Sequence, residues 1–373
     1  ILRQGEQTDR FDVTILRDKI DVKEQEAKIT YEIRKENGRT YRFGVIDLPS
    51  FYGGEKGGRS SFEDVKKLLA EARLQQVDGM VLNLSRNGGG LLEEAVRLTG
   101  LFIGKGAIVA VKDSRGRVMI LANGSASPGK EYDPRNMMTF PVKEPRALYM
   151  GPLVVLTSRI SASASEIVAG ALQDYRRALI VGSDHTYGKG SVQTLLPLPW
   201  ELGAMKVTSG LYFLPGGNST QKKGVAADVR LPGWYALEEI GEAALDYPLP
   251  AQAIAPFLNG RGAVLQWKPV EKTLIATLIS KSQSRVAKDA KFAKIIKDNK
   301  EAADRKGIIQ LDDYRKTMKK ENAGIEKETR FEQRQKAREQ YAPYVNESVN
   351  ILFDMVRPEA STALTLNKDG RRP

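Results

Sequence analysis

The residues from 161 to 167, which read Ser-Ala-Ser-Ala-Ser-Glu-Ile, are the first candidates for catalysis. They follow the apolar run 153–157 and open a segment of small residues, so we expect Ser163 at a turn between a strand and a helix. Its hydroxyl can be exposed there, beside unpaired backbone N–H groups that stabilise a developing oxyanion. The stretch also fits an ordinary helix capping box of Ser163 and Glu166. Taken alone, it favours that structural role.

A serine nucleophile needs a base, and the segment 186–193, Thr-Tyr-Gly-Lys-Gly-Ser-Val-Gln, offers Lys189. A lysine can act as a base where burial lowers its pKa. Glycines flank Lys189 and a strand-like stretch follows, so its stem can be buried. The other interpretations are an ordinary turn lysine and a phosphate-binding loop. The second fails because the glycine spacing is wrong and Gly190 stands where a magnesium-binding serine or threonine belongs.

The third element is the run Asn-Gly-Gly-Gly at 87–90, placed between a predicted strand and a predicted helix. Glycines let the backbone approach a ligand closely and aim N–H groups at it. One N–H group of Gly89 or Gly90, together with that of Ala164, can form an oxyanion hole. A plain tight connection is the more common reason for such a run when it is considered alone.

The composition restricts the other chemistries. The chain has 373 residues, no cysteine and a single histidine, so disulfides, thiolate nucleophiles and multi-histidine zinc sites are excluded. A Ser-His-Asp arrangement would have to use His185. The formal net charge is +12, but acids are interleaved with the bases, which favours a solvated surface over nucleic-acid binding. No apolar run approaches the ~20 residues of a membrane span, and the proposed chemistry needs no metal or organic cofactor.

The elements that must position these motifs alternate between strands and helices, which predicts an α/β (α+β) core with a mixed, partly parallel sheet. From about residue 251 the character changes to charged, helix-prone sequence, so we expect a separate helical region. The predicted division is 1–18, 19–250 with associated cap elements, 251–361 and a tail at 362–373. Predicted strands are 11–16, 41–48, 79–84, 107–112, 153–157, 178–181, 192–196 and 205–213, with a hairpin turn at Arg115-Gly116. Predicted helices are 61–72 with Ser61 as its N-cap, 91–102, 163–173, 286–300, 311–341 and 345–356.

Taken together and in this order, the three motifs resemble those of the tail-specific protease family, the C-terminal processing peptidases. The resemblance is clear over about 40–235, and 285–356 resembles the helical extension of the larger periplasmic members. It implies a serine endopeptidase with Ser163 as nucleophile, Lys189 as base and Gln193 orienting that base. The family also treats as important for activity the positions that match Gly89, Gly90, Glu166, Asp174 and Thr186.

The resemblance further implies protein substrates with unfolded, apolar C-termini and a periplasmic location. Whether an adaptor protein is a further partner is left open by the sequence. The family normally carries a PDZ domain upstream, and only its last strand, within 1–18, can be present. The chain departs from the pattern in three places: Ser163 and Lys189 are 26 residues apart, one more than expected, Tyr187 replaces a phenylalanine, and Ala227 replaces a proline.

Two residues can be checked against helix and strand geometry. Asp174 lies about three turns along a helix from Ser163, roughly 16 Å, so we expect a structural role beside Arg176 or Arg177 and not a relay. Gln193 can reach Lys189 only if both side chains face the same way or the chain bends near Gly190. A Ser163–His185 protease, a catalytically silent peptide-binding scaffold and a nucleic-acid-binding module remain as alternatives.

Overall fold

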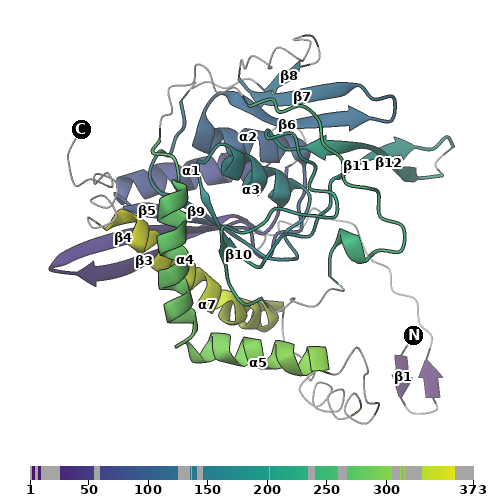
Figure 1. Ribbon diagram of the computed structural model, residues 1–373. Coiled ribbons are helices and arrows are strands. Elements are labelled where there is room, and N and C mark those ends of the chain that lie inside the picture. Colours follow the sequence, from purple (N-terminus) through teal and green to yellow (C-terminus); the bar gives the residue numbers. More distant parts are fainter. Residues whose placement is uncertain are drawn as a thin grey trace.

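A six-stranded sheet forms the centre of the computed structural model (Figure 1). The structure describes residues 2–4, 7–9, 26–53, 59–124, 135, 137–140, 146–200, 202–233, 240–258, 267–304, 311, 315 and 330–357. The strands β1 (Leu2–Gln4) and β2 (Gln7–Asp9) pair with each other. The strand predicted at 11–16, the tail at 362–373 and most of the helix predicted at 311–341 lie outside the described residues.

The central sheet is mixed, as predicted. Its order is β13-β10-β9-β5-β4-β3, and neighbouring strands are parallel except for the antiparallel pair β3–β4. The strands are β3 (Lys28–Glu36), β4 (Arg39–Asp47), β5 (Gly79–Asn83), β9 (Leu153–Thr157), β10 (Leu179–Gly182) and β13 (Val229–Arg230). The central strands β5, β9 and β10 are buried along their whole length, which explains why their sequences are continuous apolar runs.

The first face of this sheet is covered by α1 (Ser61–Leu74), α2 (Leu92–Ile103) and α3 (Ala164–Asp174). Met80 and Leu82 of β5 point into this layer, because alternate side chains of a strand face opposite sides. The N-cap of α1 is Ser60, whose hydroxyl accepts the Glu63 N–H, one residue before the predicted Ser61. The hydroxyl of Ser61 instead donates to buried Glu94 at 2.8 Å.

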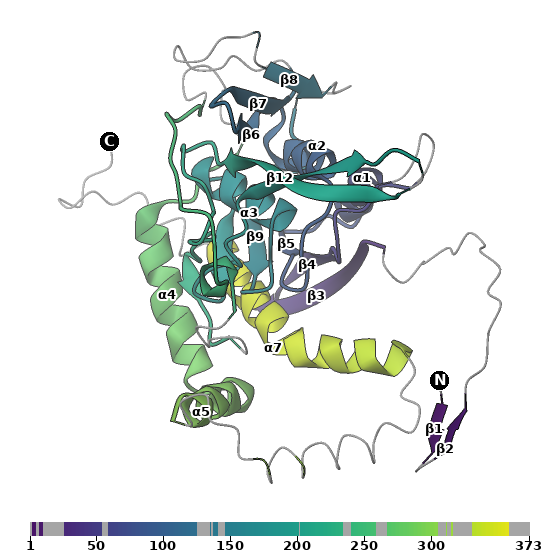
Figure 2. The same ribbon diagram turned by 90° about the vertical axis from the view of Figure 1, so that its right-hand side faces the viewer.

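The second face is covered by α4 (Lys272–Val286), α5 (Ala290–Asp304) and α7 (Arg330–Val356), as the two views show (Figures 1 and 2). Val81 of β5 belongs to this core, and the ring of Phe353 stands edge-on to Tyr41 at 5.0 Å. A methyl group on Gly79 would lie 2.9 Å from Leu352. These helices lie in the segment where a helical region was expected, and their apolar side chains share a core with the central sheet. The sequence did not predict α4.

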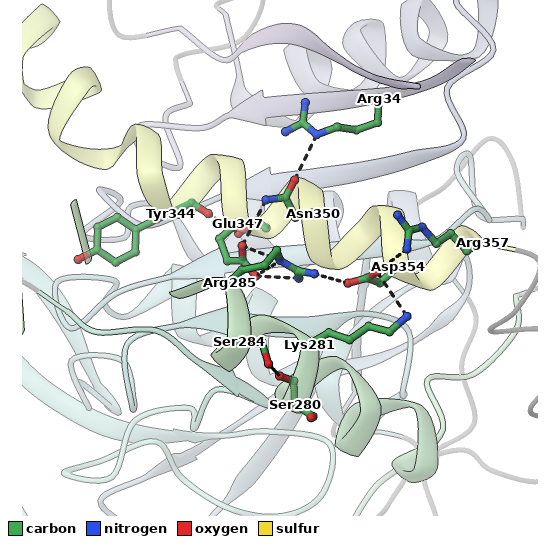
Figure 3. A network of polar contacts seen from close by, with 11 residues as sticks. Arg34, Ser280, Lys281, Ser284, Arg285, Tyr344, Glu347, Asn350, Asp354 and Arg357 are labelled. Carbon is green, nitrogen blue, oxygen red and sulfur yellow. Dashed lines mark hydrogen bonds and ion pairs between the residues drawn. The ribbon is translucent and has the colours of Figure 1, made fainter. Parts of the chain in front are cut away.

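A polar network joins the C-terminal helices to one another (Figure 3). Arg285 of α4 binds Glu347 of α7 at 2.8 Å and Asp354 of α7 at 2.7 Å. Both carboxylates are almost fully buried, and Arg285 is the nearest cation to each. Lys281 and Arg357 also lie 3.6 Å from Asp354. Asn350, one turn along α7, accepts from Arg34 of β3 at 3.2 Å and so links the helix to the sheet.

A second, five-stranded sheet has the order β11-β12-β6-β7-β8, which leaves β11 at an edge. Its strands are β6 (Gly106–Asp113), β7 (Val118–Asn123), β8 (Met137–Phe140), β11 (Ser191–Pro197) and β12 (Ala204–Phe213). The predicted turn at Arg115-Gly116 joins β6 to β7 in an antiparallel hairpin. No helix in the described ranges has the length and apolar character of a membrane span.

Candidate active site

The three motifs converge at the carboxyl ends of the parallel strands of the central sheet. β5 and β9 pair in parallel, so the loops that follow them begin at the same edge, where binding sites of parallel sheets form. The first loop carries Gly89 and the second carries Ser163. A Cβ atom built on Gly89 would lie 3.0 Å from the Ser163 Cβ. β10 adds the third segment, which leads to Lys189.

Ser163 occupies a strained turn before α3. Its backbone has φ +55° and ψ −113°, a conformation that a residue other than glycine adopts at a cost of ~1–3 kcal/mol. The next residue, Ala164, is buried and begins the helix, where backbone N–H groups have no intrahelical acceptor. The Ala164 N–H binds no acceptor among the described residues. A buried and unpaired donor beside a serine is the arrangement that an oxyanion site requires.

The carboxylate of Glu166 joins the serine segment to the lysine segment. Its Oε2 accepts the backbone N–H of Ser163 at 2.8 Å and that of Lys189 at 2.9 Å. Its Oε1 accepts the Gly188 N–H at 2.7 Å and the Thr186 hydroxyl at 2.6 Å. The side chain is completely buried. Through these bonds the buried side chains of Glu166 and Thr186 connect the segment of Ser163 to the segment of Lys189.

Burial raises the pKa of Glu166 from its ordinary value of 4.5 to about 7. The loss of hydration is the largest cause, because water no longer stabilises the anion. The four hydrogen bonds act in the opposite direction and favour the charged form. We call the four hydrogen bonds that the Glu166 carboxylate accepts the Glu166 clip. Because this carboxylate changes its charge at about pH 7, the clip is sensitive to pH near neutrality.

The side chains of Lys189 and Gln193 lie close together. The Lys189 Nζ lies 3.4 Å from the Gln193 Oε1. The pairing of β11 with β12 shifts register between Val192 and Gln193, so the bend lies two residues beyond Gly190. Lys189 is partly exposed, as is Ser163. No hydrogen bond joins the Ser163 hydroxyl to the Lys189 amine in the described part of the chain.

Of the two glycines expected to supply an oxyanion donor, Gly89 and Gly90, only Gly90 has an N–H group without an acceptor among the described residues. The Gly89 N–H donates to Asn87 Oδ1 at 2.8 Å and is not available to an oxyanion in this conformation. The backbone N–H of Phe51 donates to the Gly89 carbonyl, and the Phe51 carbonyl accepts the N–H of Leu91. In such a parallel bridge the N–H of the residue between them, Gly90, points away from Phe51. It binds no acceptor within the described residues. Gly89 instead provides close contact, because a Cβ there would lie 2.8 Å from the Ala162 carbonyl.

Asp174 lies at the far end of α3 and binds the Gly216 N–H at 2.6 Å. Burial raises its pKa. The expected arginine partners are wrong: Arg176 pairs with Glu271 at 2.8 Å, and buried Arg177 donates to two backbone carbonyls. The helix ends at Asp174 and the backbone of Arg176 has a positive φ of 52°, so helical spacing does not bring either arginine beside the carboxylate.

His185 does not contact Ser163. Its Nδ1 lies 2.6 Å from the Thr186 carbonyl, and its Nε2 lies 3.6 Å from Asp184. Both ring nitrogens thus face the loop 183–186, which counts against a histidine base.

Tyr212 of β12 belongs to the site but was missed by the sequence. Its hydroxyl lies 2.6 Å from the Lys189 carbonyl and 3.2 Å from the Ser163 carbonyl, and it accepts the Thr220 hydroxyl at 2.8 Å. The phenol is buried, and desolvation raises its pKa well above the ordinary value of 10.0, so it remains a proton donor. Only its position in a predicted apolar strand was visible in the sequence, and that signal does not distinguish it from a core tyrosine.

Comparison with known proteins finds two family matches in consecutive parts of the chain. The model of peptidase family S41 matches residues 42–231. The model of the C-terminal domain of tail specific protease matches residues 235–312. The first match contains every motif described above, and the second contains α4 and α5.

Several known proteins are similar to parts of this chain. The tail-specific protease of Haemophilus influenzae is 35% identical over 79% of this chain and 39% of its own length. The carboxy-terminal-processing protease of Bartonella bacilliformis is 37% identical over 59% of this chain and 43% of its own length. A solved structure, the photosystem II D1 C-terminal processing protease, is 31% identical with a TM-score of 0.41 over 51% of this chain and 42% of that chain. The chain thus spans about two fifths of these relatives.

Proposed function

This chain belongs to peptidase family S41, and on that premise we propose that it is a serine endopeptidase that cleaves proteins recognised through their C-terminal tails. Ser163 is the nucleophile and Lys189 the general base. The observation that supports this assignment best is the shared contact with Glu166 Oε2, which holds the two backbones together at 2.8 and 2.9 Å. A capping box alone would involve only the serine segment.

The reaction follows from these positions. Lys189, uncharged at this step, accepts the proton of the Ser163 hydroxyl, whose oxygen attacks the scissile carbonyl carbon. The N–H groups of Ala164 and Gly90 stabilise the oxyanion. The C–N bond then breaks as the Lys189 ammonium protonates the leaving amine. Water, deprotonated in turn by Lys189, hydrolyses the acyl-enzyme and regenerates Ser163.

The amine must turn from Gln193 toward Ser163 before the proton is transferred. The 3.4 Å contact with Gln193 is long, so it is easily exchanged. Catalytic hydrogen bonds often shorten only when substrate excludes water from the site. Gln193 thus holds the resting amine beside the site, and substrate binding completes the alignment.

The proposed substrates are unfolded chains with apolar C-termini, and the proposed location is the periplasm. Tail-specific and carboxy-terminal-processing proteases of bacteria are among the relatives. An upstream PDZ domain would bind such a tail by adding it as a strand, and an adaptor protein would be a further partner.

The test is cleavage of an unfolded reporter protein that ends in an apolar tail. Purified protein should cleave it, and Ser163→Ala and Lys189→Ala should each abolish cleavage while His185→Ala retains it. Cleavage that persists without the lysine amine would refute the dyad. Tight binding of the reporter without any cleavage by the unaltered protein would establish a silent scaffold instead.

A further inference from the structure

The hairpin of β11 and β12 exposes a concentration of large apolar side chains. Six residues between 195 and 205 are between 39% and 90% exposed. They are Leu195, Leu196, Leu198, Trp200, Leu202 and Met205. The hairpin projects from the body of the molecule in both views (Figures 1 and 2). Soluble proteins rarely expose such groups together unless they bind something.

This apolar hairpin continues directly from the candidate active site. Gln193, which contacts the Lys189 amine, lies in β11 itself. Gln193 is paired with Thr208 and Leu195 with Lys206, so the side chains of Gln193 and Leu195 lie on the same face. Leu196 is paired with Met205 and lies on the opposite face. Apolar groups therefore line both faces of β11, starting two residues from a site residue.

β11 is also the edge strand of its sheet. One side of its backbone pairs with β12, and the other side offers N–H and C=O groups to a further strand. Proteins usually protect such edges with charge, but the only charges that the sequence places between 193 and 207 are Glu201 and Lys206. The register shift between Val192 and Gln193 and the proline at position 197 protect this edge in part. Its large apolar side chains are nevertheless exposed at a risk of aggregation, which is consistent with a binding function.

We propose that the apolar hairpin binds an extended, continuously apolar segment of the substrate as an additional strand beside β11. This proposal rests on the proposed function and adds a determinant of substrate choice. Side chains of an added strand alternate between the two faces. A substrate segment with apolar side chains on both of its faces would contact Leu195 on one face of the sheet and the pair Leu196 and Met205 on the other face. Such continuous runs lie buried in folded proteins and become accessible on unfolding.

The chemistry of the surface favours this occupant over two others. An anionic membrane attracts clusters of lysine and arginine, whereas the hairpin carries one basic and one acidic residue in a chain of net charge +12. A second copy paired edge to edge along β11 would cover Gln193 and with it the approach to Lys189. A substrate strand uses the same edge and arrives where it is cleaved. β11 has seven residues, so it can hold about 20 Å of extended chain.

The test separates binding from cleavage by using the Ser163→Ala protein. Fluorescence anisotropy measures its affinity for a labelled, continuously apolar peptide long enough to span β11. Adding Leu195→Ser and Trp200→Ser should raise the Kd by about ten-fold or more, because two large apolar side chains no longer bury their surface against the peptide. The matched control is Met119→Ser, which removes a side chain of 46% exposure from β7 of the same sheet. The control should leave the Kd within about two-fold.

Four other results would each overturn the proposal that the apolar hairpin binds the substrate. An unchanged Kd in the hairpin variant, or an equal weakening in the control, overturns the proposal. A change from dimer to monomer in light scattering without loss of peptide binding also overturns it. So does loss of binding to phosphatidylserine vesicles with an unchanged Kd for the peptide. Thermal unfolding of each variant verifies its fold, and the single Leu196→Ser variant repeats the test if the double variant does not fold. Cleavage by the unaltered protein is a separate measurement, so failure of the protease assignment is distinguishable from failure of the binding surface.

Discussion

The backbone N–H groups of Ser163 and Lys189 donate to the same oxygen atom, Glu166 Oε2. The two residues are 26 positions apart in the chain, and β10 lies between them. The Tyr212 hydroxyl contacts the carbonyl groups of the same two residues. The candidate nucleophile and base are thus positioned through their backbones, by one acceptor and one donor that are both buried.

Glu166→Gln should lower kcat for peptide cleavage by on the order of 10–100-fold, because small misplacements of reacting groups have effects of that size. The amide has one acceptor oxygen instead of two, so it cannot bind all four donors. Steady-state kinetics should show a smaller effect on KM. Activity equal to that of the unaltered protein would mean that the clip does not position the dyad.

The Glu166 clip also predicts a pH dependence of stability. The folded protein binds this proton more tightly than the unfolded chain, since the pKa is about 7 when folded and 4.5 ordinarily. The protonated form is thus favoured in the fold, and that contribution is lost as pH rises from about 4.5 to about 7, by up to about 3 kcal/mol. Urea unfolding across this range should show a decline relative to Glu166→Gln, which does not titrate. The same dependence of the free energy of unfolding on pH in both proteins would contradict the prediction.

Activity should change in the opposite direction over the same range. Only the Glu166 anion accepts all four donors, so cleavage should rise as pH approaches and passes 7. The rise in rate that accompanies deprotonation of Glu166 should be absent from the acidic limb of the pH–rate profile of Glu166→Gln. The profile of kcat/KM measures it for the free enzyme.

Tyr212→Phe should reduce kcat by about ten-fold, because it removes the bridge between the two carbonyl groups and leaves the Thr220 hydroxyl without its acceptor. The loss of stability should be about 1–2 kcal/mol. Tyr31→Phe is the matched control, since its hydroxyl binds Glu71 at the surface. Equal kinetics in both variants would remove Tyr212 from the site.

Gly89→Ala should abolish measurable cleavage. The new methyl group would lie 2.8 Å from the Ala162 carbonyl and 3.0 Å from the Ser163 Cβ, at a φ of +110°. Gly116→Ala provides the control, because its φ is +81° but nothing lies within 4 Å of the new atom. That variant should lose about 1 kcal/mol from backbone strain and retain full activity. Comparable activity in the two variants would show that the close contact with Ser163 is dispensable.

Arg285→Ala should destabilise the protein by about 3–5 kcal/mol, because Glu347 and Asp354 would remain buried without their main partner. Chemical denaturation measures the loss. Lys297→Ala on α5, which breaks an exposed pair with Glu301 at 3.8 Å, should have little effect. A small loss at Arg285 would show that Lys281 and Arg357, which also pair with Asp354, and the Asn350 amide, which donates to Glu347, compensate the two carboxylates.

The sequence alone identified most strands and helices of the central core and the three motifs. The strands at 153–157 and 205–213 were predictable because apolar runs and their boundaries are local properties of a chain. Ser163, Lys189 and Gly89 stood out because their residue types and flanking glycines suit nucleophile, base and close backbone approach. The catalytic assignments among them remain proposals.

Only the tertiary structure decided how these groups are joined. The Glu166 and Tyr212 bridges, the use of the Gly89 N–H by Asn87 and the packing of α7 on the sheet are contacts between residues distant in sequence. A buried donor or acceptor must find a partner, but which partner it finds depends on how the strands are ordered. The residue types along the chain therefore determined which chemical groups are available. The order of the strands determined which of these groups come into contact.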